Sequence, residues 1–163
     1  MSYRSETDKF RPRIQKYLIL PDIIDIGCGH DKVTPTSFGV DIRTDINIDL
    51  LIKPNEIYQL STVYPHLKNK FDVVYSSHSL EHLLEDAGAL NSWKELLKPN
   101  GFIILYIPDS LLYNNVGNHE HVQAYTFKSF LRNIFPYVSN LEVVETFPPL
   151  PGDYSFGFVF KLI

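Results

Sequence analysis

The chain has 163 residues, of which 44% are hydrophobic and 21% charged, as is typical of a globular protein that can bury a sizeable core. We therefore expect a single domain over residues 1–163. The formal net charge is −4 and basic residues form no run, so nucleic acid is not expected as a partner. The single cysteine, Cys28, excludes an internal disulfide and a zinc site built from several cysteines.

The N-terminal segment is polar and carries no apolar signal core. Residues 1–10 are expected to be loose, and residues 11–20 to form a short helix with Pro12 in its first turn. Nowhere does the chain approach the ~18 consecutive apolar residues that would span a bilayer. These features predict a soluble, cytoplasmic protein without a membrane partner.

Short apolar runs follow, typical of strands that are buried on both faces of a parallel sheet. Apolar residues at helical spacing predict a helix over 79–97, and a threonine cap predicts another over 126–135. The predicted strands are residues 23–26, 38–41, 46–50, 71–76, 102–107, 141–147 and 156–162. This order predicts a Rossmann-like, doubly wound and mostly parallel α/β sheet that ends in a hairpin-type strand pair.

The first crossover is unusually short. Only residues 27–38 separate the first two predicted strands, and this stretch contains Pro35. A full crossover needs a dozen or more residues and usually a helix. We therefore expect one or two helical turns there at most.

Directly after the first predicted strand the chain reads DIGCG, from Asp25 to Gly29. Glycines there allow positive φ and let a ligand approach the backbone, although a tight turn alone needs the same residues. Asp41 ends the second predicted strand, where an acidic side chain can bind both hydroxyls of a ribose. Together these residues indicate a nucleoside site.

A nicotinamide-dependent oxidoreductase is a competing interpretation of the same residues. Its fingerprint, G-x-G-x-x-G, needs glycine at the sixth position, which is Lys32 here. The sequence therefore favours a nucleoside ligand without a diphosphate.

With these motifs, the sequence resembles the class I S-adenosylmethionine-dependent methyltransferases, and most of all their type 11 branch. The family's first motif is an acidic residue, x and G-x-G-x-G; Asp25, Gly27 and Gly29 match it, and Asp31 replaces the third glycine. The other resembling stretches are Gly39-Val40-Asp41, Asp49-Leu50, FDVVYSSHSLEHL at 71–83 and LKPNGF at 97–102. The resemblance spans about residues 22–135.

The resemblance implies seven strands with the last one antiparallel, S-adenosylmethionine as cofactor, and methyl transfer to a small-molecule acceptor. It places Asp41 on the ribose, Asp49 by the adenine, and the backbone after the fourth strand along the methionine part. The cofactor-binding residues expected on this basis are Asp25, Gly27, Cys28, Gly29, Asp41, Ile42, Asp49, Leu50, Ser77 and His78. A nucleoside-binding module that has lost transferase activity remains an alternative.

Two histidine pairs have spacings that can bind a metal: His78 with His82, and His119 with His121. However, the H-E-x-x-H pattern is missing, because Glu81 directly precedes His82, and no acidic cluster near the pairs completes a site. We therefore expect no metal.

The segment 109–125 follows the fifth predicted strand, where acceptors bind in the family that the chain resembles. Long polar segments of this kind often act as functional lids. A base here could take a proton from an acceptor hydroxyl as the methyl group arrives. His119 and His121 are the expected catalytic residues, since histidine is the base of this segment at neutral pH.

Overall fold

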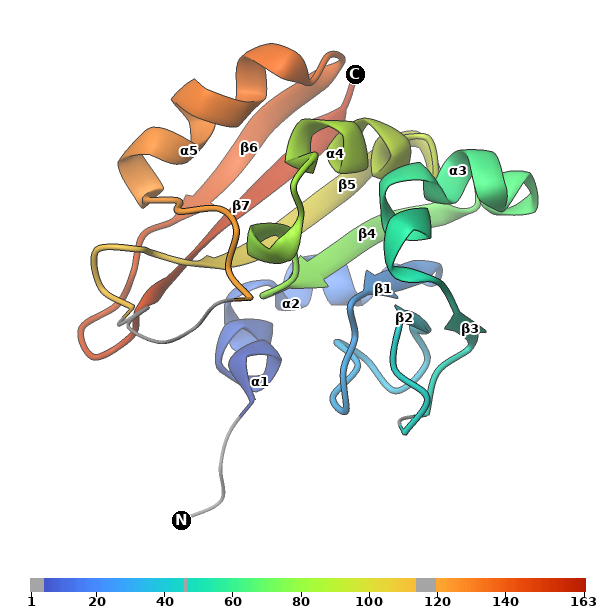
Figure 1. Ribbon diagram of the computed structural model, residues 1–163, viewed down its shortest axis with the longest axis horizontal. Coiled ribbons are helices and arrows are strands. Elements are labelled where there is room, and N and C mark those ends of the chain that lie inside the picture. The colour runs from blue at the N-terminus through green and yellow to red at the C-terminus, as the bar shows by residue number, and fades with distance from the viewer. Residues whose placement is uncertain (1–4, 46, 114–119) are drawn as a thin grey trace.

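The computed structural model describes residues 5–45, 47–113 and 120–163, and within them a seven-stranded sheet runs β3-β2-β1-β4-β5-β7-β6 (Figure 1). Neighbours from β3 to β5 pair in parallel, whereas β7 is antiparallel to both β5 and β6. The predicted α/β fold is confirmed. The strands are β1 (Ile23–Ile26), β2 (Phe38–Asp41), β3 (Leu50–Leu51), β4 (Phe71–Ser77), β5 (Leu97–Pro108), β6 (Leu141–Phe147) and β7 (Ser155–Leu162).

The direction in which the chain crosses the sheet reverses at β1. Strands β2 and β3 lie on one side of β1, and β4 returns to pair on its other side. In open α/β sheets, ligands bind at the carboxyl ends of the strands next to such a reversal. The topology therefore directs attention to the loops that follow β1, β2 and β4.

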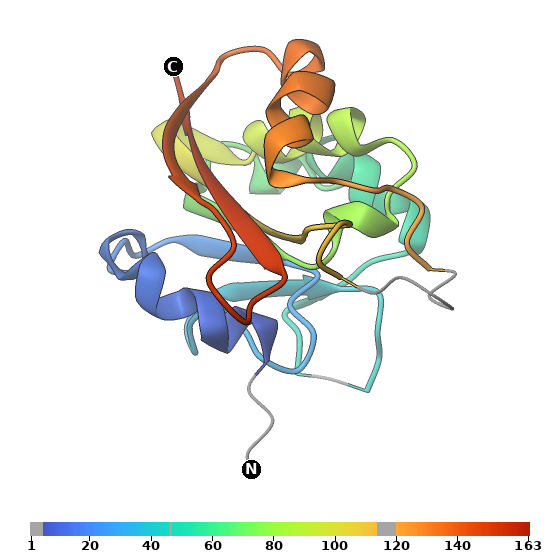
Figure 2. The same ribbon diagram turned by 90° about the vertical axis from the view of Figure 1, so that its left-hand side faces the viewer.

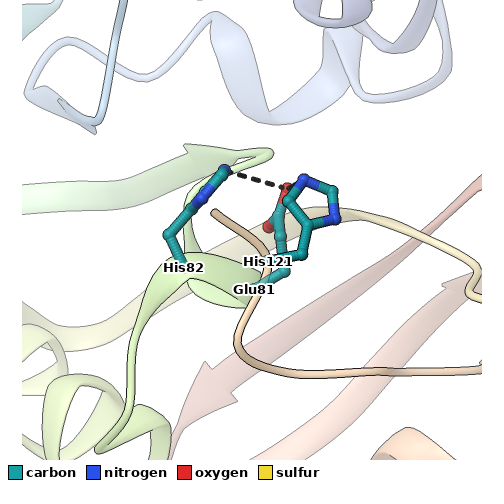
Figure 3. Close-up of side chains that lie close together, drawn as sticks. All are labelled: Glu81, His82 and His121. Atoms are coloured by element: carbon teal, nitrogen blue, oxygen red, sulfur yellow. Dashed lines mark ion pairs between the residues drawn. The ribbon is translucent and has the colours of Figure 1, made fainter. Parts of the chain in front are cut away.

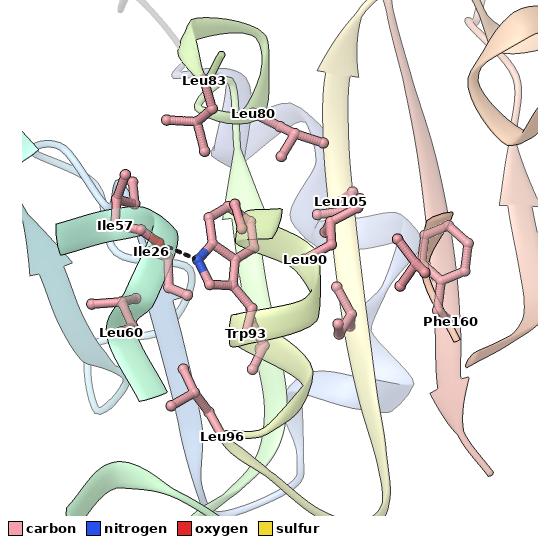
Figure 4. Packing of buried hydrophobic residues seen from close by; sticks show 14 of the residues in the cluster. Ile26, Ile57, Leu60, Leu80, Leu83, Leu90, Trp93, Leu96, Leu105 and Phe160 are labelled. Atoms are coloured by element: carbon pink, nitrogen blue, oxygen red, sulfur yellow. Dashed lines mark hydrogen bonds between the residues drawn. The ribbon is translucent and has the colours of Figure 1, made fainter. Parts of the chain in front are cut away.

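The helices after β3, β4 and β5 cover one face of the sheet (Figures 1 and 2). They are η2 (Pro54–Gln59), α3 (Leu60–Val63), η3 (Pro65–Leu67), η4 (Leu80–His82), α4 (Asp86–Lys94), α5 (Phe127–Ile134) and η5 (Phe135–Tyr137). Trp93 is fully buried beneath this layer, and its indole N–H donates to the backbone oxygen of Ile57 at 3.0 Å (Figure 4). This buried aromatic ring joins η2 to α4 and satisfies its own polar atom.

The N-terminal segment packs on the opposite face as α1 (Glu6–Phe10), η1 (Arg11–Arg13) and α2 (Gln15–Leu18) (Figure 2). The expectation that residues 1–10 are loose is therefore wrong for residues 6–10. Phe10 is fully buried and stacks on Tyr106 with ring centroids 4.3 Å apart. A Cβ at Gly157 would lie 2.4 Å from the Phe10 ring, so this glycine of β7 makes room for it. The single helix predicted over 11–20 is divided between η1 and α2.

A loop without helix connects β1 to β2; the structure describes all of residues 27–37. Val33 is fully buried and provides the apolar contact that a crossover helix would otherwise make. Its backbone N–H donates to Asp25 Oδ2 at 2.6 Å. Arg11 donates to the backbone oxygen of Val33 at 2.9 Å. Even the short helix expected here is therefore missing from the loop, which is held by Asp25 from below and by the N-terminal segment.

Two other elements differ from the prediction. The helix expected over 79–97 is interrupted, because Leu83 adopts an extended conformation after η4 and α4 starts only at Asp86. The strand expected over 46–50 is instead β3 at Leu50–Leu51.

Helix α5 begins after the predicted cap, with Thr126 Oγ1 accepting from Ser129 N at 3.0 Å. None of the described helices has the length and apolar composition needed to cross a membrane.

Candidate functional site

A cavity of about 450 Å³ opens at the carboxyl ends of β1, β2 and β4. This volume lies in the range of about 300–1,000 Å³ that is usual for small-molecule sites. Its walls come from the ends of five parallel strands, β1 to β5, and the segments that follow them. The lining residues are Gly27, Gly29, Val40, Asp41, Ile42, Arg43, Ile52, Pro54, Ile57, Tyr58, His78, Ser79, His82, Leu83 and Glu120.

The glycine loop after β1 forms the floor of the cavity. Gly27 has a φ of +73°, and a Cβ there would lie 2.0 Å from Ser79 Oγ, so only glycine fits. Gly29 also has positive φ, and a Cβ there would meet no atom within 4 Å. The open side of Gly29 leaves backbone accessible to a ligand.

Asp41 ends β2 beside this loop and is 7% exposed. Its Oδ2 accepts from the backbone N–H of Gly29 at 2.9 Å, and its Oδ1 accepts from that of Arg43 at 3.0 Å. Two backbone donors thus fix the carboxylate at the edge of the cavity. Each oxygen keeps a second lone pair for a ligand hydroxyl.

The structure brings five of the ten predicted cofactor residues to the cavity wall: Gly27, Gly29, Asp41, Ile42 and His78. Asp25 and Cys28 are buried beneath the loop and do not line the cavity. Burial raises the pKa of the Asp25 carboxyl to about 7 and that of the Cys28 thiol to about 12. A thiol in this state packs as a small apolar group.

Three further predicted residues also lie outside the lining. Asp49 Oδ2 accepts from Lys32 Nζ at 2.5 Å and from the backbone N–H of Gly39 at 2.8 Å. The hydrogen bond from Lys32 lowers the pKa of Asp49. Asp49 thereby fastens the edge of β2, while Leu50 pairs with Val40 and Ser77 is buried at the end of β4.

The segment after β3 supplies a wall that the sequence interpretation missed. Ile52, Pro54, Ile57 and Tyr58 line the cavity there. A signal was present: Pro54 suits the first turn of a helix, and two apolar residues follow it closely. These side chains make one side of the cavity apolar.

His78 follows β4 with a φ of +50°, and its backbone N–H donates to the oxygen of Tyr106 at 2.9 Å. Its ring Nε2 lies 2.9 Å from Ser155 Oγ. Burial lowers the pKa of His78 to about 4, so the imidazole is neutral at pH 7. Its ring is thereby anchored to β7 at the border of the cavity.

A cluster of one glutamate and two histidines lies beside the cavity (Figure 3). Glu81 Oε1 is 3.8 Å from His82 Nε2 and 3.9 Å from His121 Nε2. Burial raises the pKa of Glu81 to about 8. The sequence shows no acidic cluster near the histidine pairs; the structure places one carboxylate, that of Glu81, between His82 and His121.

Of the two predicted catalytic histidines, His119 lies outside the described residues. His121 does not line the cavity; its side chain is 8% exposed and stacks on Tyr113, with ring centroids 5.3 Å apart. Burial lowers the pKa of His121. A neutral imidazole therefore stands next to the wall formed by His82 and Glu120.

Comparison with known proteins identifies the family. Residues 3–135 match a family model described as a methyltransferase domain. No curated protein sequence matches the chain significantly.

Solved methyltransferase structures share the fold. An S-adenosylmethionine-dependent methyltransferase from Archaeoglobus fulgidus has 17% identity and a TM-score of 0.64, covering 98% of this chain and 96% of that one. Another from Mesorhizobium loti has 11% identity and a TM-score of 0.68, covering 96% of this chain and 98% of that one. The 1,6-didemethyltoxoflavin-N1-methyltransferase of Burkholderia thailandensis was solved with 1,6-didemethyltoxoflavin and S-adenosylhomocysteine bound. It has 13% identity and a TM-score of 0.68, covering 98% of this chain and 79% of that one. The chain therefore belongs to a methyltransferase family, and its fold is that of solved S-adenosylmethionine-dependent methyltransferases.

Proposed function

We propose that this chain transfers the methyl group of S-adenosylmethionine to a small-molecule acceptor, with residues 1–163 acting as one domain. The observation that carries the proposal is that Gly27, Gly29 and Asp41 meet in one cavity at the reversal point of the sheet. The residues present fit the cofactor: a fixed carboxylate suits a ribose diol, and apolar walls suit an adenine ring.

In this proposal Asp41 binds the ribose hydroxyls with the lone pairs that its backbone donors leave free. Ile42, half exposed on the wall, offers apolar surface to the adenine. The open backbone at Gly29 and the turn at His78 border the methionine part. The other predicted cofactor residues support these groups from behind: Asp25, Cys28, Asp49, Leu50 and Ser77.

S-adenosylmethionine supplies an activated methyl group on a positively charged sulfur. In the transfer, an electron pair of the acceptor forms a bond to the methyl carbon. The carbon–sulfur bond breaks, and its electron pair stays on sulfur in S-adenosylhomocysteine. Much of the rate enhancement then comes from holding the acceptor in line behind the methyl group. The anchored loop after β1 and the anchored His78 provide that rigidity.

Two features support a small acceptor. The net charge of −4 disfavours a polyanion, and the cavity has the size of a small-molecule site. The Burkholderia thailandensis enzyme, of similar fold, has 1,6-didemethyltoxoflavin bound. We place His121 on the acceptor side, where an imidazole can bind or deprotonate an acceptor directly or through a bound group. A cytoplasmic location stays a prediction from the sequence.

Calorimetry with S-adenosylhomocysteine tests the cofactor site. We expect one equivalent to bind, and a ligand at 100 times its Kd to stabilise the protein by about 2.7 kcal/mol in thermal unfolding. No heat and no thermal shift at saturating ligand would overturn the proposal. A shift with a nicotinamide dinucleotide, and none with S-adenosylhomocysteine, would favour the oxidoreductase.

Turnover separates an enzyme from an inactive binding module. Labelled S-adenosylmethionine is incubated with a panel of hydroxyl, amine and carbon-acid acceptors, and labelled product is counted. We expect transfer to at least one acceptor class. Tight cofactor binding with no transfer across the panel would favour the binding module.

A further inference from the structure

Glu81 and His82 stand next to each other in η4, and the segment 120–125 brings His121 over them (Figure 3). One ligand atom of each residue lies within 4.8 Å of the other two. Ligand atoms that share an ion at about 2.0–2.2 Å lie roughly 3–4 Å apart. The distances of 3.8 and 3.9 Å from Glu81 Oε1 are thus close to those of a metal site.

We propose that Glu81, His82 and His121 bind a divalent transition-metal ion at the border of the cavity. Two imidazoles and one carboxylate are the ligand set of several catalytic zinc sites and of non-haem iron sites.

The burial of Glu81 is the strongest support. The residue is 1% exposed, and neither carboxylate oxygen has a hydrogen-bond partner on another residue in the described part of the chain. Burying such a group without partners is costly, and buried charges are normally paired or bind metals. A cation between Glu81 and the histidines would compensate both oxygens.

His82 is oriented as metal-binding histidines usually are. Its Nδ1 lies 2.9 Å from the backbone oxygen of Glu120, which can only accept, so Nδ1 carries the proton. The lone pair is then on Nε2, the atom that lies near Glu81. A ring N–H donated to a backbone carbonyl is the usual means of fixing the tautomer of a metal ligand.

The backbone ties His121 to the same place. The oxygen of Glu81 accepts from the N–H groups of Val122 and Gln123, both at 3.0 Å. The ring of His121 stacks on that of Tyr113 and lies perpendicular to that of His82, with the two imidazole centroids 4.7 Å apart. The cluster is therefore built from two segments that are hydrogen-bonded to each other.

Three protein ligands leave coordination positions open, as in catalytic zinc sites. His82 and Glu120 line the cavity, so an ion here borders the space where an acceptor would bind. This step rests on the proposed methyltransferase function: an acceptor with a hydroxyl oxygen could complete the coordination, and the ion would lower the pKa of that hydroxyl.

The test uses the untagged chain of residues 1–163, stripped with a chelator and titrated with Zn²⁺, Mn²⁺ or Co²⁺ by calorimetry. Absorption of bound Co²⁺ is a second readout. We expect one equivalent of at least one metal to bind. Glu81→Gln, His82→Ala and His121→Ala should each weaken it about tenfold or more. His66→Ala, which removes a histidine of η3, should not.

Glu81→Gln keeps the shape of the side chain and removes its acidic group, so this variant should fold about as stably as the stripped parent. Retained binding in Glu81→Gln and His121→Ala, or no binding by the parent, would overturn the site. S-adenosylhomocysteine is titrated on the same samples. Cofactor binding without metal binding refutes the metal site alone, and the reverse result refutes the cofactor site alone.

Discussion

The guanidinium of Arg11 donates to Asp31 Oδ1 at 2.8 Å, and Asp31 occupies the position of the family's third glycine. The same guanidinium reaches the backbone oxygen of Val33 and the carboxylate of Asp8. The N-terminal segment thus holds the loop after β1 that no helix supports. The exchange of glycine for aspartate creates an anchor.

Arg11→Ala should therefore lower the free energy of unfolding by about 1–3 kcal/mol, since it removes several charge-assisted hydrogen bonds. The loop becomes less ordered, so affinity for S-adenosylhomocysteine should also fall. Urea denaturation and calorimetry measure the two effects. Asp31→Gly restores the family residue but breaks the anchor, and it should weaken the cofactor site as well. Tighter binding by Asp31→Gly would contradict this explanation.

Asp41→Ala should weaken binding of S-adenosylhomocysteine by about 10- to 100-fold, because charge-assisted hydrogen bonds contribute about 1.5–3 kcal/mol. Asp41→Glu keeps the negative charge, so its affinity for S-adenosylhomocysteine should fall less than that of Asp41→Ala. Calorimetry gives both affinities. Glu142→Ala, which removes an exposed carboxylate from β6 at the far edge of the sheet, is the matched control. Unchanged affinity in Asp41→Ala would remove the ribose assignment.

The strands could be predicted because each carries its own signal. The runs at Ile23–Ile26 and Phe38–Asp41 match β1 and β2 end to end, and a strand buried on both faces needs only continuous apolar residues. The position of Asp41 follows, because the last residue of a parallel strand lies at the ligand-binding edge.

What could not be predicted depends on contacts between distant residues. Asp49 is expected beside the adenine, and the side chain that fixes its carboxylate is Lys32, 17 positions earlier in the chain. Glu81 looked like an ordinary helix residue. Its burial beside His121 depends on hydrogen bonds from residues 122 and 123 to its backbone, and no local pattern encodes that pairing.

Gly27→Ala should destabilise the fold by about 1–3 kcal/mol, because alanine is strained at a φ of +73° and its Cβ would collide with Ser79 Oγ. Thermal or urea unfolding measures the loss. Adding Ser79→Gly removes the collision but leaves the backbone strain, so the double variant should recover only part of the stability. Full recovery would show that the strain at Gly27 is negligible.

The contribution of Asp25 to stability should fall as the pH rises from about 4 to 7, because burial raises the pKa of this carboxyl to about 7. An unfolded aspartate has a pKa of about 3.9, so the folded state binds more protons in this window. The loss from this group is on the order of 4 kcal/mol. Urea denaturation across the window should show that the free energy of unfolding of Asp25→Asn rises with pH relative to that of the parent. An equal slope in parent and variant would mean that Asp25 is ionised in the fold.

His121→Ala should slow methyl transfer at saturating S-adenosylmethionine while leaving affinity for the cofactor near that of the parent. The residue lies next to the cavity wall formed by His82 and Glu120 and does not itself line the cavity, so we expect its loss to affect the acceptor and not the cofactor. A base or an ion ligand at this position should be worth about 10²-fold or more in rate. Rates and cofactor affinities are measured across about pH 6 to 8, with His66→Ala as the control.

The split between rate and affinity decides where His121 acts. A fall in cofactor affinity as large as the fall in rate would make the segment 120–125 part of the cofactor site and move the acceptor elsewhere. Full activity at every pH would reduce His121 to a packing residue. If the rate falls and added Zn²⁺ or Mn²⁺ stimulates the parent but not the variant, His121 acts through the ion it shares with Glu81. If added metal does not change the rate of the parent, the imidazole of His121 acts on the acceptor directly.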